Sequence, residues 1–190
     1  MAEIALVDTS LRDGNQSLWA AVGIDTAKTL TVAPVLERVG FKAIDFTTST
    51  HMGVAVRYKR EDPWERIRLM AAATPRTPLQ FMSTGFRFIS WETASPEFMT
   101  LAFEVLARNG IRRFCLADPM NDAQSNIACA RMVKGVGGEF VIAALVFTLS
   151  PTTTTGTTPK RRGNSPPARR WMRSTSRIRG DSCHRAAPAR

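Results

Sequence analysis

Apolar residues in the first 150 positions fall into short runs separated by longer amphipathic stretches. The short runs predict five buried strands, at 4–7, 43–46, 79–82, 113–117 and 140–147. The stretches between them predict helices over 26–39, 63–73, 95–108 and about 122–134. The last strand is wholly apolar, which is typical of a strand covered on both faces. Alternating strands and helices predict a parallel α/β sheet with right-handed crossovers.

Local capping signals mark the ends of the predicted helices. Asp25 can cap the helix that begins at residue 26, and Gly40 can end it. Pro63 follows Asp62 and suits the first position of the next helix.

The composition changes abruptly at Pro151. Residues 151–190 carry one Lys and nine Arg against one Asp, so they hold a net charge of +9 out of the +10 of the whole chain. The 16 basic and 15 acidic residues of positions 1–150 nearly balance. A segment rich in Arg, Pro and Thr with few apolar residues cannot bury enough surface to order itself. We therefore expect one folded unit over 1–150 and a disordered basic tail over 151–190.

Charge and composition also limit the possible partners. A basic tail attracts nucleic acid non-specifically, but Trp171 stands alone, so the tail lacks the interleaved aromatic residues that stack on bases. No apolar run reaches the ~18 residues of a membrane span, and the N-terminus lacks the pattern of a signal peptide. Cys115, Cys129 and Cys183 show no metal-ligand spacing, which favours reduced thiols and a cytoplasmic protein without membrane contact.

The most informative motif follows the first apolar run. Arg12, Asp13, Gly14 and Gln16 stand where a buried strand opens into a loop. The glycine lets the backbone bend there. An aspartate beside an arginine stays ionised and can bind a divalent metal. The motif therefore indicates a polar site at the end of the strand.

Three segments together resemble the carboxyltransferase domain of biotin-dependent enzymes, such as pyruvate carboxylase, the α chain of oxaloacetate decarboxylase and transcarboxylase. They are DTSLRDGNQSLWA (8–20), RYKREDPWERIR (57–68) and RTPLQFMSTG (76–85). This family lies in the metallolyase superfamily, so the resemblance implies a (β/α)₈ or TIM barrel rather than an open doubly wound sheet. A complete barrel takes about 250 residues. The sequence therefore predicts a partial TIM barrel of about five β–α units.

The resemblance also suggests why the composition changes after residue 150. The family's next strand carries an Ile-Lys-Asp-x-x-Gly-Leu-Leu motif. Among the codons that encode residues 170–184, some permit Ile-Lys-Asp-Pro-Gly-Gly-Leu-Leu in an alternative reading frame. We expect a C-terminal truncation caused by a frameshift rather than a natural basic arm. The nucleotide sequence of the gene tests this, because an early stop codon in the alternative frame contradicts it.

The resemblance assigns roles within the first motif. Asp13 stands at the position that binds the family's divalent metal. Arg12 and Gln16 match the positions that hold the carboxylate and the carbonyl of a keto acid, and a guanidinium fork suits a carboxylate. The alternative for Arg12 is a structural salt bridge to Asp8 or Asp45. Asp8 itself is expected to support the loop by hydrogen bonding.

Further site residues are expected on the same face of the barrel. Asp118 and Asn121 follow the fourth strand, at the face where such barrels place their active sites, and are expected to line the pocket. The family completes its metal site with a carboxylated lysine and a His-x-His pair on later strands, and this reading frame contains no His-x-His.

Two segments depart from the family pattern. Pyruvate carboxylases carry an arginine before the glycine of Leu-Leu-Arg-Gly, but here Thr84 precedes Gly85. Arg87 lies close enough in sequence to replace that arginine. Residues 47–53 stand where the family has Gly-Gly-Ala-Thr, and His51 among them is expected to be a solvated loop residue. The substitution at Thr84 makes pyruvate itself a doubtful substrate.

The resemblance implies a metal-dependent transfer of a carboxyl group between biotin and a keto acid in the intact parent protein. The cofactors would be a divalent metal (Zn, Mn or Co) and biotin on a carrier protein or domain, and the intact form would be a homo-oligomer. We expect this chain to retain neither cofactor and to be inactive. One alternative is a non-biotin metallolyase, such as a hydroxymethylglutaryl-CoA lyase or an aldolase-like enzyme. Another is a non-catalytic protein that binds nucleic acid through its basic tail.

Overall fold

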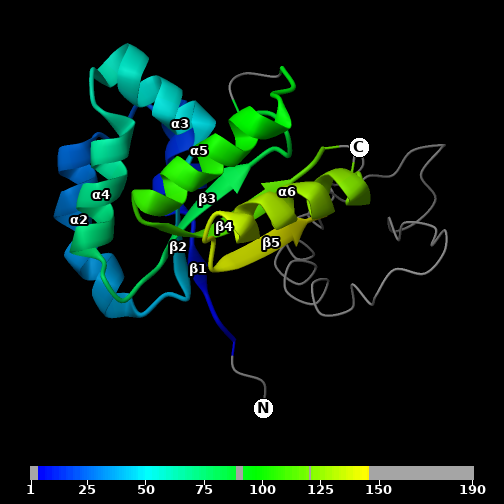
Figure 1. Cartoon of the computed structure of the whole chain (residues 1–190). Coiled ribbons are helices and arrows are strands. Elements are labelled where there is room, and N and C mark those ends of the chain that lie inside the picture. The colour runs from blue at the N-terminus through cyan, green and yellow to red at the C-terminus, as the bar shows by residue number, and fades with distance from the viewer. Residues whose placement is uncertain (1–3, 89–91, 120, 146–190) are drawn as a thin grey trace, which may run out of the picture.

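Five parallel strands form one sheet in the computed structural model, which describes residues 4–88, 92–119 and 121–145 (Figure 1). Each strand pairs with the next one along the chain, in the order β1-β2-β3-β4-β5. The strands are β1 (Val7–Asp8), β2 (Ala43–Thr48), β3 (Leu79–Ser83), β4 (Ile111–Ala117) and β5 (Phe140–Ala144). The predicted parallel α/β sheet is therefore confirmed.

Helices connect the strands, and four of them are the predicted ones. These four are α2 (Thr26–Val39), α4 (Pro63–Ala73), α5 (Pro96–Arg108) and α6 (Ala123–Gly135). The structure adds short helices that the apolar pattern does not predict: α1 (Asn15–Trp19), α3 (Ser49–Val54) and two five-residue π-helical turns, η1 (Ser10–Gly14) and η2 (Ala55–Lys59). All four additional elements follow β1 or β2, so they build up the carboxyl end of the sheet.

The predicted caps set the helix boundaries. The Asp25 side chain accepts a hydrogen bond of 2.8 Å from the backbone N–H of Lys28, and Gly40 ends α2 in the left-handed conformation with φ of 77°. The Asp62 side chain accepts from the N–H of Trp64, while Pro63 takes the first position of α4. A proline there loses no helical hydrogen bond.

The core lies between the sheet and the helices that cover it. Phe46, Phe81, Phe103 and Phe114 are among the largest fully buried side chains. The rings of Phe103 on α5 and Phe114 on β4 meet edge to face with centroids 5.7 Å apart. Burying such aromatic groups removes a large apolar area from water and holds the helices against the sheet.

The strand order distinguishes a barrel from a doubly wound sheet. Right-handed crossovers that always step in the same direction place every connecting helix on the same face of the sheet. A doubly wound sheet needs a reversal of strand order to put helices on its second face. The order here has no reversal. The described part is therefore about five β–α units of a TIM barrel, as predicted.

Both edge strands differ from the prediction. The predicted strand 4–7 is reduced to β1, and Ile4 and Leu6 are exposed, because β1 pairs only with β2 among the described residues. The fifth strand is not covered on both faces, contrary to the prediction. Val141 is buried, but Phe140 is exposed and residues 142–144 are half-buried, since β5 lies at the other edge of the sheet.

The predictions for segment 151–190 lie outside the described residues. Within the described ranges, none of the helices has the length and the apolar character to cross a bilayer.

Candidate functional site

A cleft of about 440 Å³ opens at the carboxyl ends of β2 and β3, beside the loop that follows β1. In parallel barrels this is the face that carries active sites, because the loops that follow the strands converge there. The cleft is lined by Arg12, Gln16, Thr48, Ser49, Thr50, Gly53, Val54, Arg57, Tyr58, Met82 and Thr84. Both predicted substrate-binding residues of the first motif, Arg12 and Gln16, are among them.

Arg12 is held in place by two carboxylates. Its Nε and Nη2 atoms donate to the same oxygen of Asp45, at 2.8 and 2.5 Å, and its Nη1 donates to Asp13 at 2.8 Å. The structural salt bridge to Asp45 therefore exists alongside the position of Arg12 at the cleft. Three of the five N–H groups of Arg12 are engaged, which leaves two for a ligand.

Burial raises the pKa of Asp45, whose side chain is almost completely inaccessible, and the charge and hydrogen bonds of Arg12 oppose that rise. A buried carboxylate of this kind needs its cation, and the cation needs the carboxylate, because either charge alone would be costly away from water. The pair therefore fixes the Arg12 guanidinium at the inner wall of the cleft.

Asp8 supports the loop as predicted. One of its carboxylate oxygens accepts from the Ser10 hydroxyl at 2.8 Å and the other accepts from the Ser10 backbone N–H at 3.3 Å. These bonds start η1, and η1 in turn carries Arg12.

Asp13 lies at the surface beside Arg12, and its role as a metal ligand stays a prediction. Its side chain is 60% exposed, its Oδ1 already accepts from Arg12, and it is not among the cleft-lining residues. No group of three or more His, Cys, Asp or Glu side chains is placed to hold a metal ion within residues 4–88, 92–119 and 121–145. A lone carboxylate and water hold a divalent ion weakly.

His51 corrects a sequence prediction. It is not a solvated loop residue, because it lies in α3 and is only 6% exposed. Its Nδ1 lies 3.0 Å from the hydroxyl of Thr48, which caps α3. Burial, assisted by the positive charges of Arg66 and Arg12, lowers the pKa of His51 to about 4, so the ring is neutral at pH 7.

Asp118 and Asn121 do not line the cleft. Asp118 is buried just after β4, and its Oδ2 accepts at 2.8 Å from the backbone N–H of Asp122, the residue that caps α6. Asn121 has a left-handed φ of 55° in the same turn. Their predicted contact with a substrate remains a prediction, and the described contact of Asp118 is a structural one.

Thr84 faces the cleft, whereas Arg87 is not among its lining residues. The Thr84 hydroxyl donates to the backbone carbonyl of Arg87 at 3.0 Å, which closes the turn after β3. Arg87 therefore does not supply the cleft with a substitute for the family's arginine.

The sequence analysis assigned no role to Arg57, although this residue lines the cleft beside Tyr58 on η2. The sequence feature that could have identified it is its position at the start of segment 57–68, which resembles the carboxyltransferase family.

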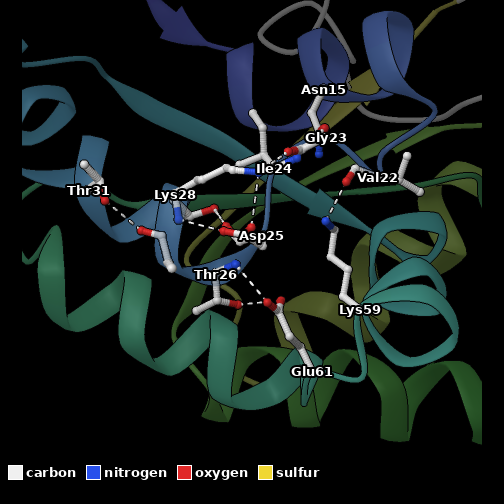
Figure 2. A network of polar contacts seen from close by, with 12 residues as sticks. Asn15, Val22, Gly23, Ile24, Asp25, Thr26, Lys28, Thr31, Lys59 and Glu61 are labelled. Atoms are coloured by element: carbon white, nitrogen blue, oxygen red, sulfur yellow. Dashed lines mark hydrogen bonds and ion pairs between the residues drawn. The ribbon is translucent and has the colours of Figure 1, made fainter.

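A polar network fixes η2 relative to the helix that carries Gln16. Figure 2 shows Lys59 reaching Val22 in the connection between α1 and α2, and Glu61 reaching Thr26 at the start of α2. Lys59 donates to the carbonyl of Val22, while both oxygens of Glu61 accept from Thr26, one from its N–H and one from its hydroxyl. These contacts join segments more than 30 residues apart in sequence. The wall of the cleft therefore depends on long-range contacts of the tertiary structure.

Comparisons with known proteins agree with the fold and with the motifs. No model of a protein family matches the chain. The chain is 32% identical over 149 residues to a pyruvate carboxylase subunit of Methanocaldococcus jannaschii, a match that covers 78% of this chain and 26% of that protein. It is 30% identical over 149 residues to the 2-oxoglutarate carboxylase large subunit of Hydrogenobacter thermophilus, a match that covers 78% of this chain and 22% of that protein.

The structure is similar to the carboxyl transferase domain of Rhizobium etli pyruvate carboxylase solved with 3-bromopyruvate. The TM-score is 0.74 at 22% identity, over 82% of this chain and 26% of that one. Such a likeness shows the shared barrel fold. The sequence matches confirm the resemblance to the carboxyltransferase domains of pyruvate carboxylase-like enzymes. The chain spans only about a quarter of the length of these relatives.

Proposed function

We propose that the cleft binds a keto acid and is the substrate-binding part of a carboxyltransferase-type domain. The observation that carries this proposal is the placement of Arg12 and Gln16 on one cleft at the carboxyl end of the strands. Arg12 still has N–H groups for a carboxylate or a keto oxygen, and the Gln16 amide can donate to the same ligand. Orienting the acid in this way lowers the entropic cost of reaction.

The intact parent would transfer a carboxyl group between biotin on a carrier and the keto acid, in keeping with relatives that are named as pyruvate carboxylase and 2-oxoglutarate carboxylase subunits. The divalent metal, the biotin carrier, the homo-oligomer and the cytoplasmic location belong to this proposal for the parent. For the chain itself we propose keto-acid binding without turnover, because among the described residues Asp13 belongs to no group of three or more His, Cys, Asp or Glu side chains placed to hold a metal ion.

Binding and catalysis can be tested separately on the full chain. Binding of pyruvate and 2-oxoglutarate is measured by isothermal titration calorimetry. Gln16→Leu is expected to weaken binding by about tenfold, since it removes hydrogen bonds to the ligand. Gln124→Leu is the matched control, because Gln124 is exposed on α6 outside the cleft. Failure of the native chain to bind either acid contradicts the proposal.

Turnover is measured by carboxyl exchange and by oxaloacetate decarboxylation with added manganese or zinc. We expect no turnover above the rate of the free metal. Clear turnover that Gln16→Leu abolishes would overturn the proposed inactivity while leaving the proposed binding function in place.

A non-biotin metallolyase remains the second candidate. It is favoured by Thr84, which presents a hydroxyl to the cleft where pyruvate carboxylases carry an arginine. Binding of an acyl-CoA in preference to the free keto acids is the outcome that would select this alternative. The nucleic-acid alternative rests on segment 151–190, outside the described residues.

A further inference from the structure

Two arginines line the cleft, and they differ in how their charges are balanced. Arg12 is bonded to Asp45 and to Asp13, so its positive charge is already compensated by carboxylates within hydrogen-bond distance. Arg57 is exposed, and no ion pair or hydrogen bond involves its side chain among the described residues. The uncompensated positive charge in the cleft therefore comes from Arg57.

The rest of the cleft contains nothing that would neutralise Arg57. Among its described lining residues there is no Asp or Glu, and the polar ones besides the arginines are the amide of Gln16 and the hydroxyl groups of Thr48, Ser49, Thr50, Tyr58 and Thr84. Hydroxyl, amide and guanidinium groups can all donate hydrogen bonds to an anion. A cleft with this composition favours a ligand that carries more than one negative group.

The backbone presents Arg57 in a defined way. It lies on η2, a π-helical turn whose first residue, Ala55, is buried and whose last residue, Lys59, is bonded to the carbonyl of Val22. Arg12 is likewise carried by a π-helical turn, η1. Such turns are rare in proteins and occur often at functional sites. The buried Ala55 and the bonded Lys59 hold the backbone of η2 in place beside the cleft.

We propose that Arg57 is a specificity-determining residue, which binds a second carboxylate and makes the cleft select keto acids with two carboxylates over those with one. The proposal rests on the proposed keto-acid binding and adds a residue to it. Arg12 and Gln16 hold the 2-oxo acid end, and the planar fork of Arg57 pairs with the distal carboxylate. A cleft of about 440 Å³ has room for a five-carbon dicarboxylate.

The test compares 2-oxoglutarate with 2-oxovalerate, a keto acid of the same chain length that has a methyl group in place of the distal carboxylate. Titration calorimetry with the full chain is expected to show 2-oxoglutarate binding about tenfold more tightly, the magnitude of one charged hydrogen-bonded pair at a partly exposed site. Arg57→Gln is expected to abolish this preference, because the affinity for 2-oxoglutarate falls by about tenfold more than the affinity for 2-oxovalerate. Arg57→Lys keeps the charge without the fork and is expected to retain part of the preference.

Arg131→Gln is the matched control, because it removes one positive charge from the exposed surface of α6, outside the cleft. It is expected to keep the full preference. Equal affinity of the native chain for the two acids, or an unchanged preference in Arg57→Gln, overturns the role of Arg57 while keeping the proposed binding function. Failure of the native chain to bind either acid overturns both proposals. Melting curves check that the variants are folded, since the exposed Arg57 has no described partner to lose.

Discussion

His51 illustrates how burial sets the chemistry of a single residue. Its ring is enclosed by the protein, one nitrogen meets the Thr48 hydroxyl, and two guanidinium groups lie near enough to disfavour protonation. The Thr48 hydroxyl oxygen also accepts from the backbone N–H of His51, so this one side chain contacts both the ring and the backbone of the histidine. A neutral ring therefore completes the cap of α3.

This neutrality makes stability depend on pH. The pKa of His51 falls from 6.5 to about 4 on folding. Because the folded-state pKa lies below the unfolded one, the unfolded chain binds the proton more tightly. The contribution of His51 is therefore fully present above pH 6.5 and is lost as the pH falls toward about 4. Urea unfolding is expected to show a loss of at most about 3 kcal/mol over this window.

The variant His51→Asn is expected to flatten this pH dependence, since asparagine can still bond to Thr48 but does not titrate. His184→Gln removes the other histidine of the chain and is expected to leave the dependence as it is. A His51 ring that titrates near pH 6.5 by NMR would contradict the buried neutral state.

At the scale of elements, the first turn of α2 is satisfied by two carboxylates from different parts of the chain. Asp25 caps it locally, and Glu61 accepts from the N–H and the hydroxyl of Thr26. Glu61 also lies 3.5 Å from the guanidinium of Arg66, which bonds to the hydroxyl of Thr29 in α2. The start of α2 and the segment that follows η2 are therefore one unit (Figure 2).

Replacing Glu61 by Gln is expected to lower the free energy of unfolding by about 2 kcal/mol, because hydrogen bonds to a charged acceptor are replaced by bonds to a neutral amide. The measurement is chemical denaturation at neutral pH. Glu92→Gln is the control, because Glu92 is exposed and has no described partner. If both variants unfold at the same denaturant concentration as the native chain, Glu61 does not join the two elements.

The contrast between Asp25 and Glu61 shows what the sequence could predict. The cap by Asp25 acts over three residues, so the bounds of α2 follow from local chemistry, and the observed helix matches the predicted range. Glu61 and Thr26 are 35 residues apart, and no periodicity relates them.

The candidate site likewise combines residues that a local motif predicts with residues that only the fold brings together. Arg12 and Gln16 come from one local motif, whereas Arg57 joins them only through the fold. The prediction for His51 was wrong because α3 has no apolar period to reveal it.

At the scale of the whole molecule, a strand order without reversal leaves a sheet with two edges among the described residues. One edge is β1, beside the exposed Leu6, and the other is β5, with the exposed Phe140. Helix α2 also exposes Val35 and Val39, one turn apart on the same face. A closed barrel has no such edges, while an open edge with apolar side chains is a template for association.

We therefore expect the chain to self-associate through its edges as its concentration rises, which light scattering coupled to gel filtration measures. Leu6→Lys is expected to weaken this association by roughly tenfold, because it removes an apolar side chain worth about 1.5–3 kcal/mol when buried and adds a charge to an edge strand.

Leu101→Lys is the matched control. Leu101 is 56% exposed and Leu6 64% exposed, but Leu101 lies on α5 away from both edges. An equal effect of the two substitutions points to general surface hydrophobicity, and a native chain that stays monomeric at high concentration excludes edge pairing. Only a loss confined to Leu6→Lys assigns the association to the unpaired side of β1.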